Sequence, residues 1–301
     1  MRIDRPFHEG ELLVQRRTGE EAEARRNGRA IADAIVPGAV RFVAAQPFVV
    51  VGNVAPGGAT WASLLFGTPG FARVTCEREL VLDLARAAHD PADPWLANVA
   101  ADPRVGLLFL EPETRRRLRV NGTVRSEGER LVVAVAESYP NCPQYIRPRR
   151  LEVLELGVVA RNPDVRRGTA LDSHARALVR KADTFFVASS NPAGHVDASH
   201  RGGEPGFVTR LDERTLSIPD YPGNRLYNTL GNLALNPRAG ATFLDFETGR
   251  ALLLSGTATI EFARPGHEPV TGGTNRFWHL RVEEWISFVL PVRLRVEQLD
   301  A

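Results

Sequence analysis

The 301-residue chain has little cysteine and lysine and no long hydrophobic run, and each shortage argues against a class of protein. Cys76 and Cys142 are its only cysteines and form no CxxC pair. We therefore expect neither a disulfide framework nor a thiolate zinc site, and a reducing cytoplasm is the simplest location. Lys181 is the only lysine, which leaves one candidate for a catalytic Schiff base.

Membrane and nucleic-acid partners are not expected either. No stretch reaches the roughly eighteen apolar residues that a membrane-spanning helix needs. The charged segment Met1 to Glu11 does not have the apolar core of a secretory signal or an anchor. Lys and Arg number 38 against 36 Asp and Glu, for a net charge of +2, and no basic stripe is interleaved with aromatic residues. Nucleic-acid binding proteins typically carry such a stripe.

Several well-known catalytic motifs are absent. The chain contains no GxGxxG after a strand, no GxxxxGK[ST] and no GxSxG, which argues against a Rossmann dehydrogenase, a P-loop enzyme and a typical α/β-hydrolase. There is no HExxH. His195 and His200 flank Asp197, but side chains five apart on a strand point to opposite faces, so we expect no metal there.

What the chain does contain is an internal duplication. Trp61-Ala62-Ser63 to Phe71 aligns with Asp197-Ala198-Ser199 to Phe207, 136 positions later (61 and 197). After a two-residue slip, Asp102-Pro103-Arg104 aligns with Asn236-Pro237-Arg238. A self-match of this length predicts two duplicated domains, and two copies in one chain can form a pseudo-two-fold pair.

Short β-prone runs separated by Gly and Pro turns recur in each half, and a brief helix precedes Asp102 and Asn236. The fold is therefore predicted to be mainly β, with a small antiparallel β-barrel and short helices in each half. The expected domains are a leader and helix (1–38), a first barrel (39–170), and a second barrel with a C-terminal extension (171–301). A helix is expected over Glu20 to Ile35 after an irregular leader at Phe7 to Glu11. The tail from Asn275 to Gln298 is expected to form one more strand, or a helix and a strand.

Polar residues that could bind a ligand are concentrated in the second repeat. Arg201 follows a strand beside two glycines that would let a ligand approach the backbone. Gly223-Asn224-Arg225 lies where a helix running to Leu235 is expected to begin, and a helix start with an arginine suits an anion. The alternative is that Arg201 and Arg225 only form surface ion pairs with Asp197 and Asp220. The first repeat keeps the turns but has Leu65 in place of Arg201, which favours a ligand role for the second copy.

The second half resembles the pyridoxamine 5'-phosphate oxidase-like FMN-binding split barrels. The resemblance rests on D-x-S-x-R-G-x-x-P-G-F-V from Asp197, D-x-R-T-L from Asp212, P-D-x-P-G-N-R from Pro219 and N-P-x-x-G from Asn236. The first half is similar only through its Pro-Gly-Phe and Asp-Pro-Arg-x-Gly elements, and the resemblance covers roughly residues 40 to 262. It implies two tandem split β-barrels packed as a pseudo-dimer.

The resemblance also implies a cofactor, FMN, held between the barrels, and one flavin per chain. Ser199, His200 and Arg201 would form the flavin strand, and the partner barrel would contribute Trp61, Ser63 and Leu65. The groups around the ribityl phosphate would be Asp220, Asn224, Arg225 and Asn228. No catalytic residue can be assigned.

The implied activity is that of an oxidoreductase, which passes a hydride or electrons between a small organic substrate and a nicotinamide, NADH or NADPH, or oxygen. The alternative is a non-catalytic module that holds a flavin or haem for sensing or storage. The segment from Tyr139 to Ile146 is either a connector or a wall of the substrate pocket. The chain could act as a pseudo-dimeric monomer or pair again as a homodimer.

Overall fold

The computed structural model describes residues 6–157 and 164–299, which fold into two β-barrels with short helices. The first five residues of the expected leader lie outside this range. The first barrel is an antiparallel sheet with strand order β3-β4-β8-β7-β6-β1-β2-β5. Its strands are β1 (Phe48–Val54), β2 (Thr60–Gly67), β3 (Ala72–Cys76), β4 (Glu79–Asp83), β5 (Ala87–Ala88), β6 (Arg104–Glu111), β7 (Arg116–Glu127) and β8 (Arg130–Pro140).

The second barrel repeats this design in the order β12-β11-β15-β16-β17-β14-β13, with β10 beside β17. Its strands are β10 (Arg166–Gly168), β11 (Thr184–Ser190), β12 (Val196–Gly202), β13 (Thr209–Arg210), β14 (Thr215–Pro219), β15 (Arg238–Asp245), β16 (Arg250–Glu261) and β17 (Phe277–Val289). The mainly β, two-barrel prediction is confirmed. The expected division at residue 170 stays a prediction, and β10 on its first-barrel side pairs with the second sheet.

The two copies pair their strands in equivalent registers. Val49 pairs with Leu65 in the first barrel, and Phe185 pairs with Arg201 in the second, which preserves the offset of 136. The β6–β7 and β15–β16 hairpins likewise have equivalent registers, since Leu110 pairs with Arg117 and Leu244 with Ala251. These registers identify which residues of the two copies occupy equivalent places.

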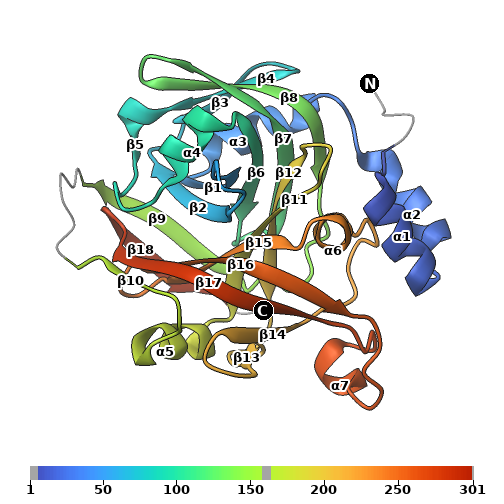
Figure 1. Cartoon of the computed structure of the whole chain (residues 1–301). Coiled ribbons are helices and arrows are strands. Elements are labelled where there is room, and N and C mark those ends of the chain that lie inside the picture. The colour runs from blue at the N-terminus through green and yellow to red at the C-terminus, as the bar shows by residue number, and fades with distance from the viewer. Residues whose placement is uncertain (1–5, 158–163, 300–301) are drawn as a thin grey trace.

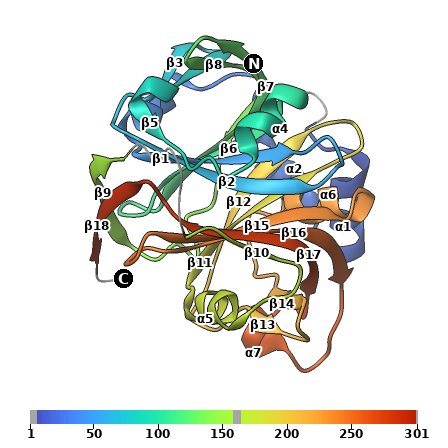
Figure 2. The ribbon, with the colours of Figure 1, turned by 60° about the vertical axis from the view of Figure 1, so that its left-hand side comes forward.

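The barrels pack through β1, β2 and β6 of the first against β11, β12, β15 and β16 of the second (Figure 2). This explains the unbroken apolar runs that open each repeat. In β1, Val49 and Val51 enter the first barrel core, whereas Phe48 and Val50 enter the cluster between the barrels. A strand buried on both faces needs apolar residues at every position rather than at alternate ones.

Helices cover the ends of the barrels, and two of them correct the predictions for the N-terminal region (Figure 1). The leader was expected to be irregular, but α1 occupies Glu9–Thr18, because His8 and Glu11 form a reciprocal capping box at its start. The next helix, α2 (Glu21–Asn27), ends at Gly28 rather than at Ile35. The other α-helices are α3 (Val40–Ala45), α4 (Trp95–Ala101), α5 (Ser173–Lys181), α6 (Asn228–Leu235) and α7 (Glu268–Thr271), with 3-10 turns at Gly28–Ala30, Pro37–Ala39 and Leu84–Arg86.

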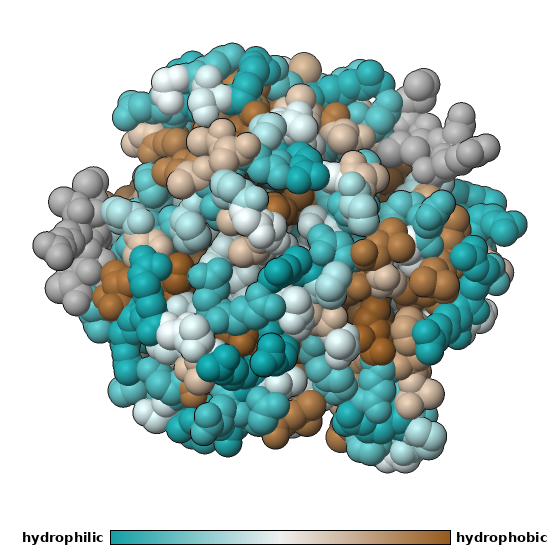
Figure 3. Space-filling model, in the orientation of Figure 1, coloured by the Kyte–Doolittle hydropathy of each residue, from teal (hydrophilic) through white to brown (hydrophobic). Residues whose placement is uncertain are grey.

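The first helix packs on α6 of the second barrel, where a side chain at Gly10 would collide with the Gly231 carbonyl. Figure 3 shows a largely hydrophilic face with apolar residues gathered over α1 and α6, among them the exposed Leu12, Leu13 and Leu235. Among the described residues, no helix is long and apolar enough to cross a membrane.

The tail forms two strands, β17 and β18 (Val292–Gln298), and no helix among its described residues from Asn275 onward. Strand β18 pairs with β9 (Arg149–Leu156), the segment after the first barrel. This two-stranded sheet lies beside β2 and contributes Leu151, Val153 and Leu294 to the apolar cluster between the barrels. It thereby covers one side of the junction between the barrels.

Candidate functional site

A cleft with about 770 Å³ of space, its open mouth included, lies on the opposite side of that junction. Both barrels form it. The first barrel contributes β7 and the segment after β8, and the second contributes β12, the loop after β14, the start of α6 and the residue before β17. The polar and aromatic residues that line it are Arg117, Arg119, Asn141, Gln144, Tyr145, His200, Arg201, Phe207, Asp220, Tyr221, Asn224, Arg225, Tyr227, Asn228, Thr229 and Arg276.

The cleft is strongly cationic. Its lining includes five arginines, and Asp220 is the one carboxylate among the lining residues. Asp220 is buried and accepts hydrogen bonds from Arg201 Nη1 at 3.0 Å and Arg276 Nε at 2.9 Å. One carboxylate therefore holds two guanidinium groups in place and neutralises only one of them.

The remaining arginines differ in their partners. Arg119 Nη1 donates to Asp197 Oδ2 at 2.7 Å across the junction between the barrels. Arg225 Nε lies 2.7 Å from Glu20 Oε1 in an ion pair with the N-terminal region. Arg117 has no carboxylate partner within residues 6–157 and 164–299. Burial, with Arg119 and Arg201 nearby, lowers the pKa of Arg117 to about 9.

Four buried nitrogen atoms of cleft residues have no hydrogen-bond partner within the described part of the chain, and one of them, Arg225 Nε, is ion-paired with Glu20. The three that have neither a hydrogen bond nor an ion pair are Arg117 Nε, His200 Nε2 and Arg201 Nε. Burial, followed by the neighbouring arginines, lowers the pKa of His200 well below its usual value, so the ring is neutral. Its Nδ1 lies 3.4 Å from Arg117 Nη1, which can only donate. The ring proton is therefore on Nε2, and all three atoms are donors.

The backbone at the cleft is strained. Tyr145, Arg225 and Tyr227 line it with φ values of 63°, 63° and 65°, in the left-handed region. Bulky residues rarely adopt this conformation, and such strain is concentrated at functional sites. Tyr227 immediately precedes α6, so the helix begins at Asn228 rather than at the expected Gly223 to Arg225. The N-terminal turn of α6 still opens into the cleft through Asn228 and Thr229.

Five of the residues predicted for the flavin and its phosphate line the cleft together with Asp220: His200, Arg201, Asn224, Arg225 and Asn228. Ser199 is buried behind them and bonds Thr229 of α6 through the two hydroxyl groups, 3.0 Å apart. Ion pairs of Arg201 and Arg225 with Asp197 and Asp220 were the alternative expectation. Arg201 does pair with Asp220, whereas Arg225 pairs with Glu20.

Other predicted residues lie elsewhere. Trp61 is buried between the barrels under Gly240, and Ser63 donates to Asp93 Oδ1 at 2.7 Å inside the first barrel, so neither lines this cleft. The space beside Gly202 and Gly203 is also not open to a ligand, because the Tyr145 carbonyl and the Phe207 ring occupy it. The segment after Tyr139 connects β8 to β9 and lines the cleft with Asn141, Gln144 and Tyr145, and its role as a wall of a substrate pocket stays a prediction.

Sequence reasoning missed Arg117, Arg119 and Arg276. The only signal for the first two is their spacing of two on a strand, which puts both on one face. Arg115 and Arg116 beside them hide this signal, because a run of arginines does not reveal which of them face a partner domain.

The equivalent position on the other side of the pseudo-dimer is filled. The counterparts of His200, Arg117 and Arg119 are Leu64, Ala251 and Leu253, which are buried together in the cluster between the barrels. The β9–β18 sheet packs on the same cluster. Among the described residues the cleft is thus built on one side of the junction only, and no group of three potential metal ligands is present.

Comparison with known proteins agrees with this architecture. The family model described as pyridoxamine 5'-phosphate oxidase matches residues 35–160 and again residues 171–286. This chain belongs to the pyridoxamine 5'-phosphate oxidase family. The two matches confirm the tandem duplication of this family's split barrel. No curated protein sequence matches the chain.

Solved structures that resemble this family member each cover about two fifths of it. A HupZ protein from Group A Streptococcus is 17% identical, covers 43% of this chain and 96% of its own, and has a TM-score of 0.31. The haem storage protein HutZ from Vibrio cholerae is 14% identical, covers 40% and 95%, and has a TM-score of 0.29. An FAD-binding protein from Mesorhizobium loti is 13% identical, covers 41% and 97%, and has a TM-score of 0.30.

Proposed function

We propose that the cleft binds FMN and that the protein is an FMN-dependent oxidoreductase. The observation that carries the proposal is the set of three unpartnered donors on Arg117, His200 and Arg201 in a cleft with an excess of arginine. Buried donors without partners are costly, and a phosphate offers several acceptor oxygens in one compact group. The donor set thus fits a ligand that carries a phosphate.

The residues have distinct proposed roles. Arg201, Arg225, Asn224 and Asn228 bind the ribityl phosphate, and Arg117 adds the charge of the first barrel. Asp220 does not contact the phosphate but positions Arg201 and Arg276. Ser199 anchors α6 to the flavin strand. Trp61 and Ser63 lie outside the cleft: Trp61 packs in the apolar cluster between the barrels, and Ser63 bonds Asp93 of the first barrel.

The aromatic side of the cleft suits the planar part of the ligand. Tyr145 and Tyr221 stack with ring centroids 4.9 Å apart, and Phe207 lies 6.3 Å from Tyr221. Bound FMN would supply transfer of a hydride or an electron pair between a small organic substrate and NADH, NADPH or oxygen. Arg117 and Arg201 would stabilise negative charge that develops on the ligand, because they are fixed cations in a partly buried site.

The first experiment is an absorption spectrum of the purified protein, followed by mass analysis of any small molecule released on denaturation. FMN near one equivalent per chain supports the proposal. A protein that is colourless and fails to bind added FMN overturns it. The second candidate is a non-catalytic haem-binding module, and a Soret band in that spectrum would support it instead.

Affinities then test the assigned residues. FMN should bind at least ten-fold more tightly than riboflavin, which lacks the phosphate. Arg201→Ala with Arg225→Ala should abolish this preference without unfolding the protein, because Asp220 keeps its bond to Arg276. Arg125→Met is the control, since Arg125 lies on β7 and is exposed outside the cleft. Normal FMN affinity in the double variant would exclude the assignment.

Reduction of the bound flavin separates the enzyme from a storage module. Bleaching of the flavin absorbance by NADH or NADPH, followed by reoxidation in air, supports the oxidoreductase. Inertness towards both donors supports a non-catalytic flavin-binding module.

A further inference from the structure

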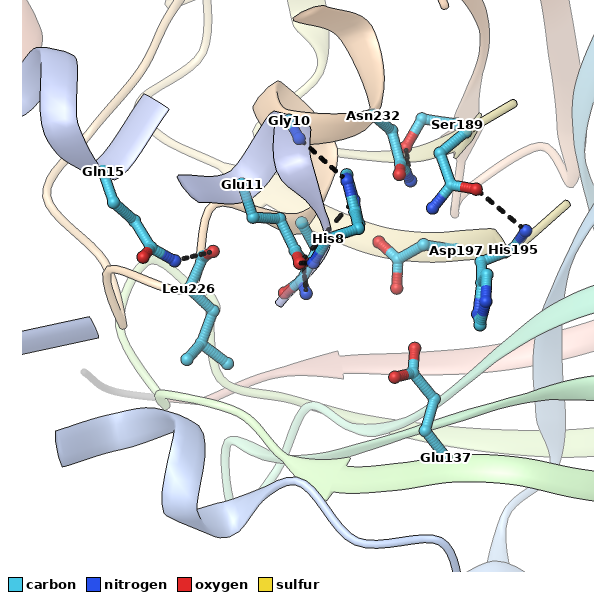
Figure 4. Close-up of polar contacts among 12 residues, drawn as sticks. His8, Gly10, Glu11, Gln15, Glu137, Ser189, His195, Asp197, Leu226 and Asn232 are labelled. Carbon is cyan, nitrogen blue, oxygen red and sulfur yellow. Dashed lines mark hydrogen bonds and ion pairs between the residues drawn. The ribbon is translucent and has the colours of Figure 1, made fainter. Parts of the chain in front are cut away.

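A second cavity, with about 660 Å³ of space when its open mouth is included, lies beside the cleft between α1, α6, β7, β8 and the turn from β11 to β12. It differs from the cleft in charge. Glu11, Glu137 and Asp197 line it, and Figure 4 shows the Asp197 and Glu137 carboxyl groups pointing towards each other from opposite walls, with the His195 ring beside them.

The charges around this acidic cavity do not balance. Arg119, which binds Asp197, is the one guanidinium against three carboxyl groups. The other titratable groups that face the cavity are His8, His195 and Tyr139, and burial lowers the pKa of His8, which favours its neutral form. Two carboxyl groups therefore have no permanently charged partner among the described residues at the cavity.

The carboxyl groups respond to this imbalance by retaining protons. Burial, together with Glu137 and Asp197, raises the pKa of Glu11 to about 8. Burial, with Asp197 next to it, also raises the pKa of Glu137. A cation in the cavity would replace these protons and restore the charged form.

Two buried amide atoms supply a second and independent observation. Asn121, only 2% exposed, donates through Nδ2 to Glu137 Oε1 at 2.7 Å, which leaves its Oδ1 without a partner. Asn191, 3% exposed, accepts from the His195 backbone N–H through Oδ1, which leaves its Nδ2 without a partner. Both line the cavity, so its wall presents one free acceptor and one free donor.

We propose that the acidic cavity binds a small organic cation, an amine that also carries a hydroxyl or carbonyl oxygen. The ammonium group donates to Glu11, Glu137 and Asn121 Oδ1, and the oxygen accepts from Asn191 Nδ2. Buried polar groups without partners are costly, and this ligand satisfies both amide atoms. It also supplies a positive charge to Glu11 and Glu137, which are hydrogen-bonded but have no ionic partner. The acidic cavity is distinct from the cleft, because the Arg119–Asp197 pair lies between them, although the two share Asn228, whose Nδ2 donates to Glu11.

Titration calorimetry on the full chain, in an amine-free buffer, tests this site with ethanolamine and serinol as probes. Both should bind and release protons, whereas ethylene glycol, which lacks the charge, should not bind. Glu137→Gln should weaken ethanolamine at least ten-fold, and Glu127→Gln, an exposed control, should have no effect. Asn191→Ala provides a second variant that removes the free donor without changing charge, and a three-fold or greater loss is expected.

The outcomes are decisive with or without FMN present. Failure of both amines at millimolar concentration overturns the proposal, as does equal affinity in Glu137→Gln. Binding of Ca²⁺ without binding of either amine would also overturn it, since the cavity would then be an oxygen site for a hard cation. Amine binding by a protein that ignores FMN would uphold this inference while the proposed function fails.

Discussion

Arg119 Nη1 on β7 of the first barrel donates to Asp197 Oδ2 on β12 of the second, at 2.7 Å and with both side chains almost fully buried. The pair separates the cationic cleft from the acidic cavity, and it links the two copies of the duplicated domain. Arg119 also lies over the Tyr139 ring, 5.7 Å from its centroid.

Breaking this pair on one side should destabilise the protein. We expect Arg119→Met or Asp197→Asn to lower the free energy of unfolding by about 3 to 5 kcal/mol, because the charge that remains is buried without a partner. The double variant should lose less than the sum, with a coupling of about 1 to 3 kcal/mol. Urea unfolding of the four proteins measures this, and strictly additive losses would contradict it.

Removing the unpartnered cation of the cleft should have the opposite effect on stability. Arg117→Met keeps most of the aliphatic stem and removes a partly buried charge, so the FMN-free protein should gain about 1 kcal/mol at neutral pH. The same variant should bind FMN at least ten-fold more weakly. Arg116→Met is the matched control, because Arg116 is the exposed neighbour on the other face of β7. Parallel behaviour of the two variants would argue against a role for Arg117 in binding.

Two equivalent glycines should be intolerant of alanine. A Cβ at Gly106 would lie 2.6 Å from Asp197 Cα, and one at Gly240 would lie 2.6 Å from the Thr60 carbonyl oxygen. Both obstacles are backbone, so Gly106→Ala and Gly240→Ala should each cost about 1 to 3 kcal/mol or more by pushing the barrels apart. Gly57→Ala, with open space at its Cβ, should be harmless in the same thermal unfolding assay. A stable Gly240→Ala would show that the barrels do not approach so closely.

Asp93 should make stability depend on pH. Burial raises its pKa to about 7, although the hydrogen bond from Ser63 opposes the shift. Since the folded state holds a proton that the unfolded state releases, the free energy of unfolding should fall between pH 4 and 7 by up to about 1.4 kcal/mol per unit from this group.

Asp93→Asn should remove this contribution of Asp93 to the pH dependence of the free energy of unfolding. Denaturant unfolding at several pH values would measure it. Asp102 provides a control of opposite sign. Its hydrogen bonds with Arg104 lower its pKa, so Asp102→Asn should remove stability that is lost as the pH falls. Parallel pH profiles of Asp93→Asn and the unchanged protein would contradict the prediction.

The candidate site could be predicted only in part. Several cleft residues of the second copy were visible in the sequence, because Arg201, Asn224 and Arg225 stand in a local pattern that the first copy lacks, but Arg276 was not. The contribution of the first barrel was not visible. Arg117 is 83 positions from His200, and no local rule determines which face of β7 meets β12.

The sequence by itself determined the duplication, the two β-barrels and much of the polar set of the second copy, since these follow from repeated spacing and from apolar residues at strand positions. Only the tertiary structure decided that α1 packs on α6, that Trp61 and Ser63 stay outside the cleft, and that one side of the pseudo-dimer is filled by Leu64, Ala251 and Leu253. The physical reason is that these contacts form between segments far apart in the sequence. Close packing of buried side chains and backbone determines which segments meet, and the spacing of residues along the chain does not show it.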